Sequence, residues 1–414
     1  MKILLVNDYA TLTGGAEMMM QTLQTHLRSR GHDARLFAST AQKDKAESIA
    51  DYECFGTTSR FRTLLQTANP WAAHRLHQVL TEFRPDVVHV RLFLTQLSPL
   101  ILKLLQAVPS ILHIAWYRPI CPVGTKMLPT GASCHHSVGV ACYQKGCLPL
   151  RDWVPLMAQH RLWQAWQDSF DVVVSNSFSV HESLLQAGIA STQVIWNGVP
   201  VRPQRPLLTS APTVAYAGRL ASPKGVDVLL QAFAKVVSHR PEATLLIAGQ
   251  GTEKDSLTAL TQSLNLQENV LFLGHLSREE MERRFASAWV QVIPSRWAEP
   301  FGIVATEAMM RGTAVISSDT GGLAEIVADG QSGFLVPPGA VEPLADKLLL
   351  LLQDRDLAEQ MGQAGRDRAL LKFSESACVN QFVELYQTLL ASKEQGSLAA
   401  PPYSVSSLGS FHGS

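Results

Sequence analysis

Short runs of apolar and β-branched residues alternate along the chain with longer amphipathic stretches. Six such runs in the first half predict β-strands, at residues 3–6, 34–37, 87–90, 110–114, 172–174 and 193–196. Six more in the second half predict strands at residues 213–217, 244–248, 270–273, 290–293, 314–317 and 334–336. Because strands that alternate with helical stretches form repeated βα units, the pattern predicts an α/β protein with parallel sheets.

A segment rich in proline and turn residues separates the two sets of predicted strands. It runs from 197 to 206 and contains three prolines, so it is the best candidate for a linker. We therefore expect one α/β domain at residues 1–200 and a second at 201–373, with a cleft between them where small molecules bind. A helix over residues 374–395 is expected to pack back on the first domain, and the Ser-, Gly- and Pro-rich residues 396–414 predict a disordered tail.

The composition narrows the classes of function. Hydrophobic residues make up 46% of the 414 residues, which is enough for two sizeable cores and excludes disorder for most of the chain. Lys and Arg total 35 and so do Asp and Glu, and this neutral balance argues against a nucleic-acid partner. We find no apolar run long enough for a membrane span and interpret the N-terminus as a strand rather than a signal peptide, so we expect a cytoplasmic protein.

Glycines and charged residues follow several predicted strands, at the edge where parallel sheets bind ligands. Gly14 and Gly15 follow the first strand of the chain, and Gly249 follows the second strand of the second half. Arg219 and Lys224 stand in the loop after the first strand of the second half. An Arg fork and a Lys point charge could bind one diphosphate, and two solvated loop cations are the alternative interpretation.

The segment from 294 to 309 carries the strongest candidate site. It predicts the end of a strand, a loop and then a helix that begins near Ile303. Glu299 lies before this helix, and Glu307 lies eight positions later, inside it. The free N–H groups and the dipole at a helix N-terminus suit a phosphate, and two carboxylates there can accept hydrogen bonds from sugar and ribose hydroxyls. Acidic residues that merely complement the helix charge are the alternative.

This motif resembles a known family of enzymes. Glu299-Pro300-Phe301-Gly302 through Glu307 is similar to the Glu-x7-Glu signature of the retaining GT-B glycosyltransferases of the family 4 type, the glycosyl transferases group 1. Further matches in order and place are Gly14 to Glu17, Asn197 to Val199, Gly218 to Leu220, Lys224-Gly225 and Gly321 to Phe334. The resemblance spans roughly residues 1–390 and implies the GT-B fold, with two Rossmann-like parallel-sheet domains that face a central cleft. It also implies a nucleotide-diphosphate sugar held mainly by the second domain.

Roles for individual residues follow from this resemblance. It implies that Arg219, Lys224 and Glu299 are catalytic residues, the two cations on the diphosphate and the carboxylate on the donor sugar. The other implied substrate contacts are Phe301, Gly302 and Ile303 at the donor sugar, Glu307 at the ribose, Gly14 and Gly15 near the phosphate, and Gly249 and His275 in the loops that would recognise the base.

A histidine is the fourth catalytic candidate. His113, in the strand predicted at 110–114, matches the position of a family histidine that sits near the donor sugar. A histidine satisfied within the core is the alternative. Relatives often have Asp directly after this histidine, whereas Ile114 and Ala115 follow it here, and this difference concerns the positioning of the acceptor.

The implied chemistry is substitution at the anomeric carbon with retained configuration. The resemblance favours attack by the acceptor on the face that the diphosphate leaves, with the leaving phosphate as base and the protein's cations stabilising its charge. Relatives work without a catalytic metal, so no cofactor is expected beyond the nucleotide-sugar co-substrate. The acceptor would be a glycan, a lipid-linked molecule or a small molecule, in polysaccharide or glycoconjugate synthesis. A nucleotide-sugar epimerase on the same fold, or an inactive nucleotide-sugar-binding scaffold, is the alternative function.

Four cysteines, Cys121, Cys134, Cys142 and Cys147, cluster in the segment that follows His113. Structural zinc favours four Cys or Cys/His ligands, but the irregular spacing also leaves unpaired thiols or disulfides open. In each case we expect this loop to face the acceptor side of the cleft and to determine the choice of acceptor.

Two segments combine cations with aromatic residues, at 59–84 and 151–166. Cationic, aromatic helices can lie at a bilayer surface and bring an enzyme to a lipid-linked acceptor, which predicts a peripheral membrane contact. Buried tryptophans beneath a solvated cationic face are the alternative, which the neutral overall charge favours.

Overall fold

The first half of the chain forms a seven-stranded sheet in a computed structural model that describes residues 1–12, 14–42, 47–60, 62–190 and 193–394. Its strands are β1 Lys2–Tyr9, β2 Asp33–Ser39, β3 Tyr52–Cys54, β4 Val87–Val90, β5 Ser110–Ile114, β6 Val172–Ser175 and β7 Gln193–Val194. Its helices are α1 Gly15–Ser29, α2 Arg62–Thr67, α3 Pro70–Phe83, α4 Leu102–Leu105, α5 Ala141–Gln144, α6 Leu150–Trp166 and α7 Phe178–Gln186, with 3-10 turns at Pro99–Ile101 and Gln167–Ser169.

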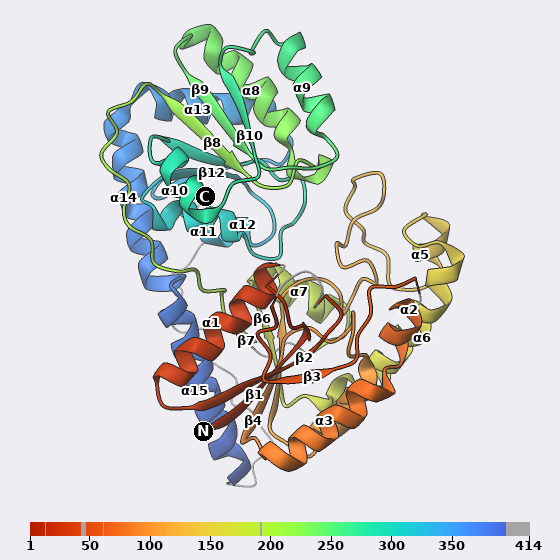
Figure 1. The fold of residues 1–414 in the computed structure, drawn as a ribbon. Coiled ribbons are helices and arrows are strands. Elements are labelled where there is room, and N and C mark those ends of the chain that lie inside the picture. Colours follow the sequence, from red (N-terminus) through yellow and green to blue (C-terminus); the bar gives the residue numbers. More distant parts are fainter. Residues whose placement is uncertain (13, 43–46, 61, 191–192, 395–414) are drawn as a thin grey trace.

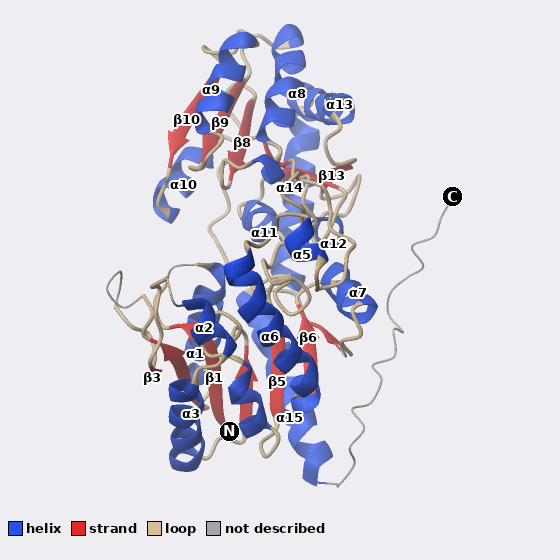
Figure 2. Cartoon of the chain, turned by 90° about the vertical axis from the view of Figure 1, so that its right-hand side faces the viewer, coloured by secondary structure: helices blue, strands red, loops and turns tan. Residues whose placement is uncertain are grey.

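Every strand pair in this sheet is parallel, and the order is β3-β2-β1-β4-β5-β6-β7. Helices lie on both faces of the sheet (Figure 2). Apolar side chains of α3, α4 and α6 cover one face, and those of α1 cover the other. Because the order reverses between β1 and β4, a crevice opens at the carboxyl ends of these two strands.

The second half repeats this architecture with six strands. The strands are β8 Thr213–Ala217, β9 Thr244–Ala248, β10 Val270–Gly274, β11 Val290–Ile293, β12 Ala314–Ser318 and β13 Gly333–Val336. The helices are α8 Val226–His239, α9 Lys254–Ser263, α10 Arg278–Phe285, α11 Ile303–Met310, α12 Leu323–Ile326, α13 Val341–Gln353 and α14 Arg355–Lys372, with a 3-10 turn at Ser222–Lys224. The sheet is again parallel, in the order β10-β9-β8-β11-β12-β13, so its crevice lies between β8 and β11.

The last helix, α15 Glu375–Glu394, returns to the first domain. Figure 1 shows α14 along the second domain and α15 continuing down the first. The two crossings between the domains pair with each other, because Val199 N donates to Phe373 O at 2.8 Å and Glu375 N donates to Val199 O at 3.1 Å. Farther along α15, the Tyr386 hydroxyl lies 2.6 Å from Nδ1 of His89 inside the first domain.

The observed elements confirm the α/β class and the parallel sheets. All twelve predicted strands are present, with small differences in their bounds, but β3 was missed because its three residues are too few to show a pattern. The predicted tail, 396–414, and the last residue of the predicted terminal helix lie outside the described residues. Within the described ranges, no helix combines the length and the apolar character that crossing a membrane requires.

Candidate functional site

A cavity of about 490 Å³ lies between the two domains, where the crevices of the two sheets face each other. The first domain contributes Gly14 and Gly15 from the loop after β1. The second contributes residues 299–304, from the loop after β11 and the start of α11. We call this space the interdomain cavity. It brings together six of the predicted site residues, namely Gly14, Gly15, Glu299, Phe301, Gly302 and Ile303.

The loop after β11 is shaped by a glycine directly before α11. Gly302 has a φ of 133°, and a Cβ there would lie 2.6 Å from Cδ2 of Leu323. A side chain at this position is therefore excluded by both conformation and space. The carbonyl of Glu299 accepts a 2.7 Å hydrogen bond from Gly322 N, which attaches the loop to the next loop of the sheet. The Glu299 side chain is thereby presented at the cavity on a restrained backbone.

Lys224 and Glu299 form an ion pair at the edge of the cavity. The Lys224 ammonium lies 2.9 Å from Oε1 of Glu299, although the residues are 75 positions apart in sequence. Their side chains are only 18% and 13% exposed. Ser295 donates a further hydrogen bond to the same carboxylate oxygen, and the ring of Trp297 lies 5.2 Å from the ammonium. The arrangement holds one cation and one carboxylate in fixed orientation beside an open space.

Three other predicted residues lie at the carboxyl edge of the same sheet but outside the cavity lining. Arg219 follows β8, Gly249 follows β9 and His275 follows β10, and the side chains of Arg219 and His275 are exposed. Gly249 has a φ of 150°, and a Cβ there would lie 1.8 Å from the carbonyl oxygen of Gly218. The ends of β8 and β9 therefore approach each other closely. The exposed side chains of Arg219 and His275 lie at this same edge of the sheet.

Glu307 lies within α11, one turn beyond its start. It does not line the interdomain cavity. Burial raises the pKa of its carboxyl, and the positive charges of Arg311, Arg278 and Arg202 act in the opposite direction. No hydrogen bond to another described residue engages this side chain, so its carboxylate oxygens are free to accept from a ligand.

His113 is not brought to the cavity. It lies within β5 and its side chain is fully buried. Its Nδ1 is 2.8 Å from Nη1 of Arg91 and 3.2 Å from Nε2 of His89, and burial with the Arg91 charge lowers the pKa of its imidazole well below the usual value. This burial matches the core alternative, and the catalytic role expected for His113 stays a prediction. The residues that line the cavity after β5 are Ala115 and Trp116.

Several polar residues of the cavity had no predicted role, although Glu17 and Asn197 belong to the motifs that carry the family resemblance. Arg91, Glu17, Asn176 and Asn197 line the cavity. Arg91 is buried, donates from Nη2 to Asn197 Oδ1 at 3.2 Å, and has no partner for Nε among the described residues. Burial lowers the pKa of this guanidinium to about 10. Arg91 directly follows β4, so the rule that selected the other loops would also have found it.

The four clustered cysteines are free thiols, so the disulfide alternative is contradicted. In the part of the chain that the structure describes, no group of three or more His, Cys, Asp or Glu side chains is arranged to hold a metal ion. Burial and the nearby thiols of Cys142, Cys134 and Cys121 raise the pKa of the Cys147 thiol, so the four sulfurs lie near one another, and zinc binding stays a prediction.

Comparison with known proteins gives matches in both halves of the chain. Residues 201–368 match the family described as Glycosyl transferases group 1, and residues 13–113 match Glycosyltransferase Family 4. Glycogen synthase of Mycobacterium tuberculosis is 32% identical over 224 residues, which are 52% of this chain and 54% of that protein. Phosphatidyl-myo-inositol mannosyltransferase of Mycobacterium leprae is 34% identical over 189 residues, 45% of this chain and 50% of that protein. The chain thus spans about half the length of the curated relatives it matches.

Solved structures share the whole fold. Sucrose-phosphate synthase from Thermosynechococcus elongatus has a TM-score of 0.70 at 24% identity and covers 94% of this chain and 99% of its own. Anabaena HepE in complex with UDP and glucose has a TM-score of 0.67 at 22% identity and covers 94% of this chain and 100% of its own. Both halves of the chain thus match glycosyltransferase families, and the chain has the GT-B fold of these solved structures.

Proposed function

We propose that the protein is a retaining glycosyltransferase, which moves a sugar from a nucleotide-diphosphate sugar to a glycan, lipid-linked or small-molecule acceptor in polysaccharide or glycoconjugate synthesis. The observation that carries the proposal is the interdomain cavity, where Gly14 and Gly15 face the loop of Glu299 and Lys224 is held against that carboxylate. Complexes of the similar Anabaena HepE contain UDP or UDP-glucose, which supports a nucleotide-sugar donor.

The donor would lie along the carboxyl edge of the second sheet. Lys224 and Arg219 would bind the diphosphate, and Glu299 with the backbone of Phe301 and Gly302 would hold the sugar. Glu307 would accept from the ribose hydroxyls, and the base would reach the strand ends at Gly249 and His275. A cation next to the leaving group stabilises the negative charge that develops there, which lowers the barrier directly.

The reaction proposed is a substitution at the anomeric carbon on the face of the leaving group. The bond from that carbon to the diphosphate oxygen breaks, the bond to the acceptor oxygen forms, and the acceptor's proton passes to the leaving phosphate. Glu299 serves as an oriented hydrogen-bond acceptor in this scheme, because Lys224 and Ser295 already engage its carboxylate. No metal ion is assigned a role.

Nucleotide binding provides the first test. UDP, GDP, ADP and their common sugar conjugates are each added to the wild type, to Lys224→Ala and to the control Lys235→Ala, whose lysine pairs with Glu342 on the protein surface. One nucleotide at ~100 times its Kd stabilises the folded chain by about 2.7 kcal/mol and raises the Tm by several degrees. We expect this shift in the wild type and the control and a smaller one in Lys224→Ala. No shift with any nucleotide would contradict the proposal.

Product analysis tests the transfer itself. The preferred donor is incubated with and without acceptors, and the anomeric configuration of the product is read by NMR. A product with the configuration of the donor sugar is expected only when an acceptor is present. An altered sugar nucleotide formed from donor alone would instead identify an epimerase.

A peripheral membrane contact belongs to the same proposal. Phe55, Leu64 and Trp71 are exposed in the first domain, and the Phe55 and Trp71 rings lie 5.5 Å apart. Leu150 and Val154 are exposed on the neighbouring α6. Apolar side chains of this kind can enter the boundary of a bilayer. Flotation with vesicles of anionic phospholipid should retain the wild type and the control Leu371→Ser, from the second domain, and lose Trp71→Ala. Equal flotation of all three would contradict the contact.

A further inference from the structure

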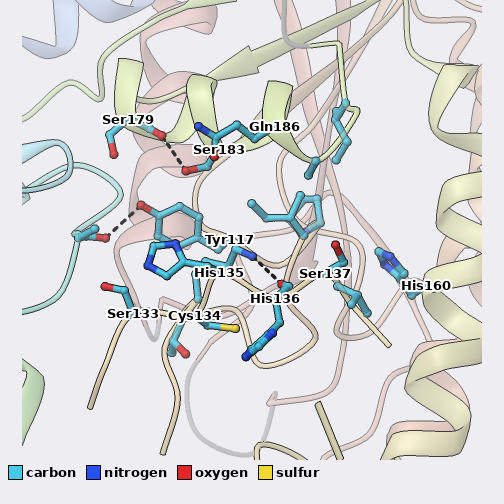
Figure 3. A pocket seen from close by; sticks show the side chains of 18 of the residues that line it. Tyr117, Ser133, Cys134, His135, His136, Ser137, His160, Ser179, Ser183 and Gln186 are labelled. Atoms are coloured by element: carbon cyan, nitrogen blue, oxygen red, sulfur yellow. Dashed lines mark hydrogen bonds between the residues drawn. The ribbon is translucent and has the colours of Figure 1, made fainter. Parts of the chain in front are cut away.

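A second cavity, of about 550 Å³, lies beneath the long segment that follows β5. We call it the loop pocket. One wall is formed by residues 133–138 of that segment, and the opposite wall by α6 and α7. In Figure 3, Ser179, Ser183 and Gln186 of α7 lie on one side of the pocket, with Ser133 and His136 of the segment on the other. Its volume is in the range of ordinary small-molecule sites.

The loop pocket shares a wall with the interdomain cavity. Tyr117 and Ala298 line the loop pocket, whereas their neighbours Trp116 and Glu299 line the interdomain cavity. The wall is held by a hydrogen bond from the Tyr117 hydroxyl to the Ala298 carbonyl, at 3.1 Å. A molecule whose reacting end enters the interdomain cavity could therefore extend its other end toward the loop pocket.

Polar side chains line the loop pocket, and none of the described residues in its lining is Asp or Glu. The lining instead provides hydroxyls, amides, imidazoles and the Lys126 ammonium, most of which can donate hydrogen bonds. The Lys126 ammonium donates one hydrogen bond to the His136 carbonyl, at 3.0 Å. Because an ammonium has three donors, two remain for a ligand. Burial lowers the pKa of the His160 imidazole, which in its neutral form can accept or donate a hydrogen bond.

Several of these donors have no hydrogen-bond partner among the residues that the structure describes. The side-chain amides of Gln164 and Gln167 on the α6 side and Gln186 on α7 line the pocket and make no hydrogen bond to another described residue. The aromatic floor, in contrast, is already satisfied, because Trp163 Nε1 donates to Pro119 O at 3.1 Å. The pocket thus presents unused donors around a fixed aromatic surface. Lys126 is the one Lys, Arg, Asp or Glu among the described lining residues, and its charge favours anions over cations in the pocket.

We propose that the loop pocket binds the distal part of the acceptor, and that this part is a saccharide carrying an anionic group, either a carboxylate or a phosphate. The role as acceptor site rests on the proposed transferase function. Sugar hydroxyls accept from and donate to the Gln and Ser side chains, and the anionic oxygens accept from Lys126 and the exposed imidazoles of His135 and His136. The reacting hydroxyl then lies across the shared wall, in the interdomain cavity.

Saccharide binding to the full chain tests the proposal. Isothermal titration calorimetry compares trigalacturonate, phosphorylated maltotriose and neutral maltotriose. We expect at least one of the two anionic probes to bind at least tenfold more tightly than maltotriose, and the one that does so identifies the anionic group. Lys126→Gln and Gln186→Ala should weaken that binding at least threefold. Lys145→Gln removes a cation of the same segment outside the pocket and should leave it unchanged.

Two results would overturn the proposal. One is binding of the anionic probes no tighter than that of maltotriose. The other is an equal loss in Lys145→Gln, because the attraction would then be a general effect of charge. The nucleotide-induced Tm shift is measured on the same variants and should not change. Saccharide binding without any nucleotide shift would leave the pocket as a saccharide site and remove the transferase function, whereas the reverse result would remove only the pocket.

Discussion

The two cavities meet at one wall, yet the loops that form them differ in how tightly they are constrained. The loop between β11 and α11 is short, and Gly302 and the Gly322 hydrogen bond determine its path. The segment between β5 and α6 runs from 115 to 149 with only the four-residue α5 inside it. A short loop at a sheet edge has few available paths, so its residue pattern predicts its geometry. The path of a long segment depends on contacts with α6, α7 and the other domain.

The largest effect is expected on the short loop. Lys224→Ala removes the cation beside the proposed leaving group and leaves Glu299 with an uncompensated charge. Loss of one group that stabilises developing negative charge lowers kcat by about 10²- to 10³-fold. Initial rates at saturating donor and acceptor measure this, with Lys235→Ala as the control. A kcat within threefold of wild type would contradict the diphosphate assignment.

Replacing Glu307 should weaken nucleotide binding by less than Lys224→Ala lowers kcat, and it should make the folded chain more stable. Burial raises the pKa of its carboxyl above the ordinary value. The folded chain then binds this proton more tightly than the unfolded chain, so the group opposes folding as the pH rises above its unfolded pKa. Glu307→Gln should therefore have a higher Tm than wild type at neutral pH, and the difference should shrink toward about pH 4.

The same variant should bind the nucleotide more weakly. A hydrogen bond to a charged group contributes about 1.5–3 kcal/mol, which corresponds to about 10- to 100-fold in Kd. Titration calorimetry with the preferred nucleotide measures it. A more stable variant with unchanged affinity would remove Glu307 from the site but leave its burial as the cause of the stability change.

His113 lies in β5, just before the long segment, and His113→Gln should affect stability more than catalysis. His113 is buried against Arg91 and His89, and an unsatisfied buried polar group costs about 1–3 kcal/mol. We expect a lower Tm and a kcat within about threefold of wild type. A hundredfold loss of kcat in a variant with an unchanged Tm would support the catalytic assignment instead.

The smallest effect is expected from removing metal ions from the long segment. The four cysteines are free thiols, and no metal-binding group is formed among the described residues. If these thiols stay unpaired, treatment with a strong chelator leaves the Tm unchanged, and elemental analysis finds no stoichiometric zinc. Zinc at one equivalent, lost together with stability on chelation, would show that the cysteines converge on a metal.

The local pattern of residues was enough to predict most of the strands and the loops that carry the candidate donor-binding residues. Alternation of apolar runs located twelve strands, and the spacing of Glu299 and Glu307 located the loop and the helix after β11. These features depend on neighbouring residues, because buried strands and helix starts are recognised from residue types within a few positions of each other. The three-residue β3 left no such mark. Arg91 directly follows β4 and could have been found by the strand-end rule, whereas its hydrogen bond to Asn197 joins residues 106 positions apart, which no local pattern shows.

The sequence by itself therefore determined the α/β framework, the parallel sheets and the loops that carry the candidate donor residues. Only the tertiary structure decided that Lys224 pairs with Glu299 across 75 positions, that His113 is enclosed beneath the cavity, and that the segment after β5 forms a pocket against α6 and α7. The physical reason is the range of the interactions. Secondary structure follows from residues a few positions apart, whereas ion pairs, burial and cavities depend on which distant surfaces the fold brings into contact.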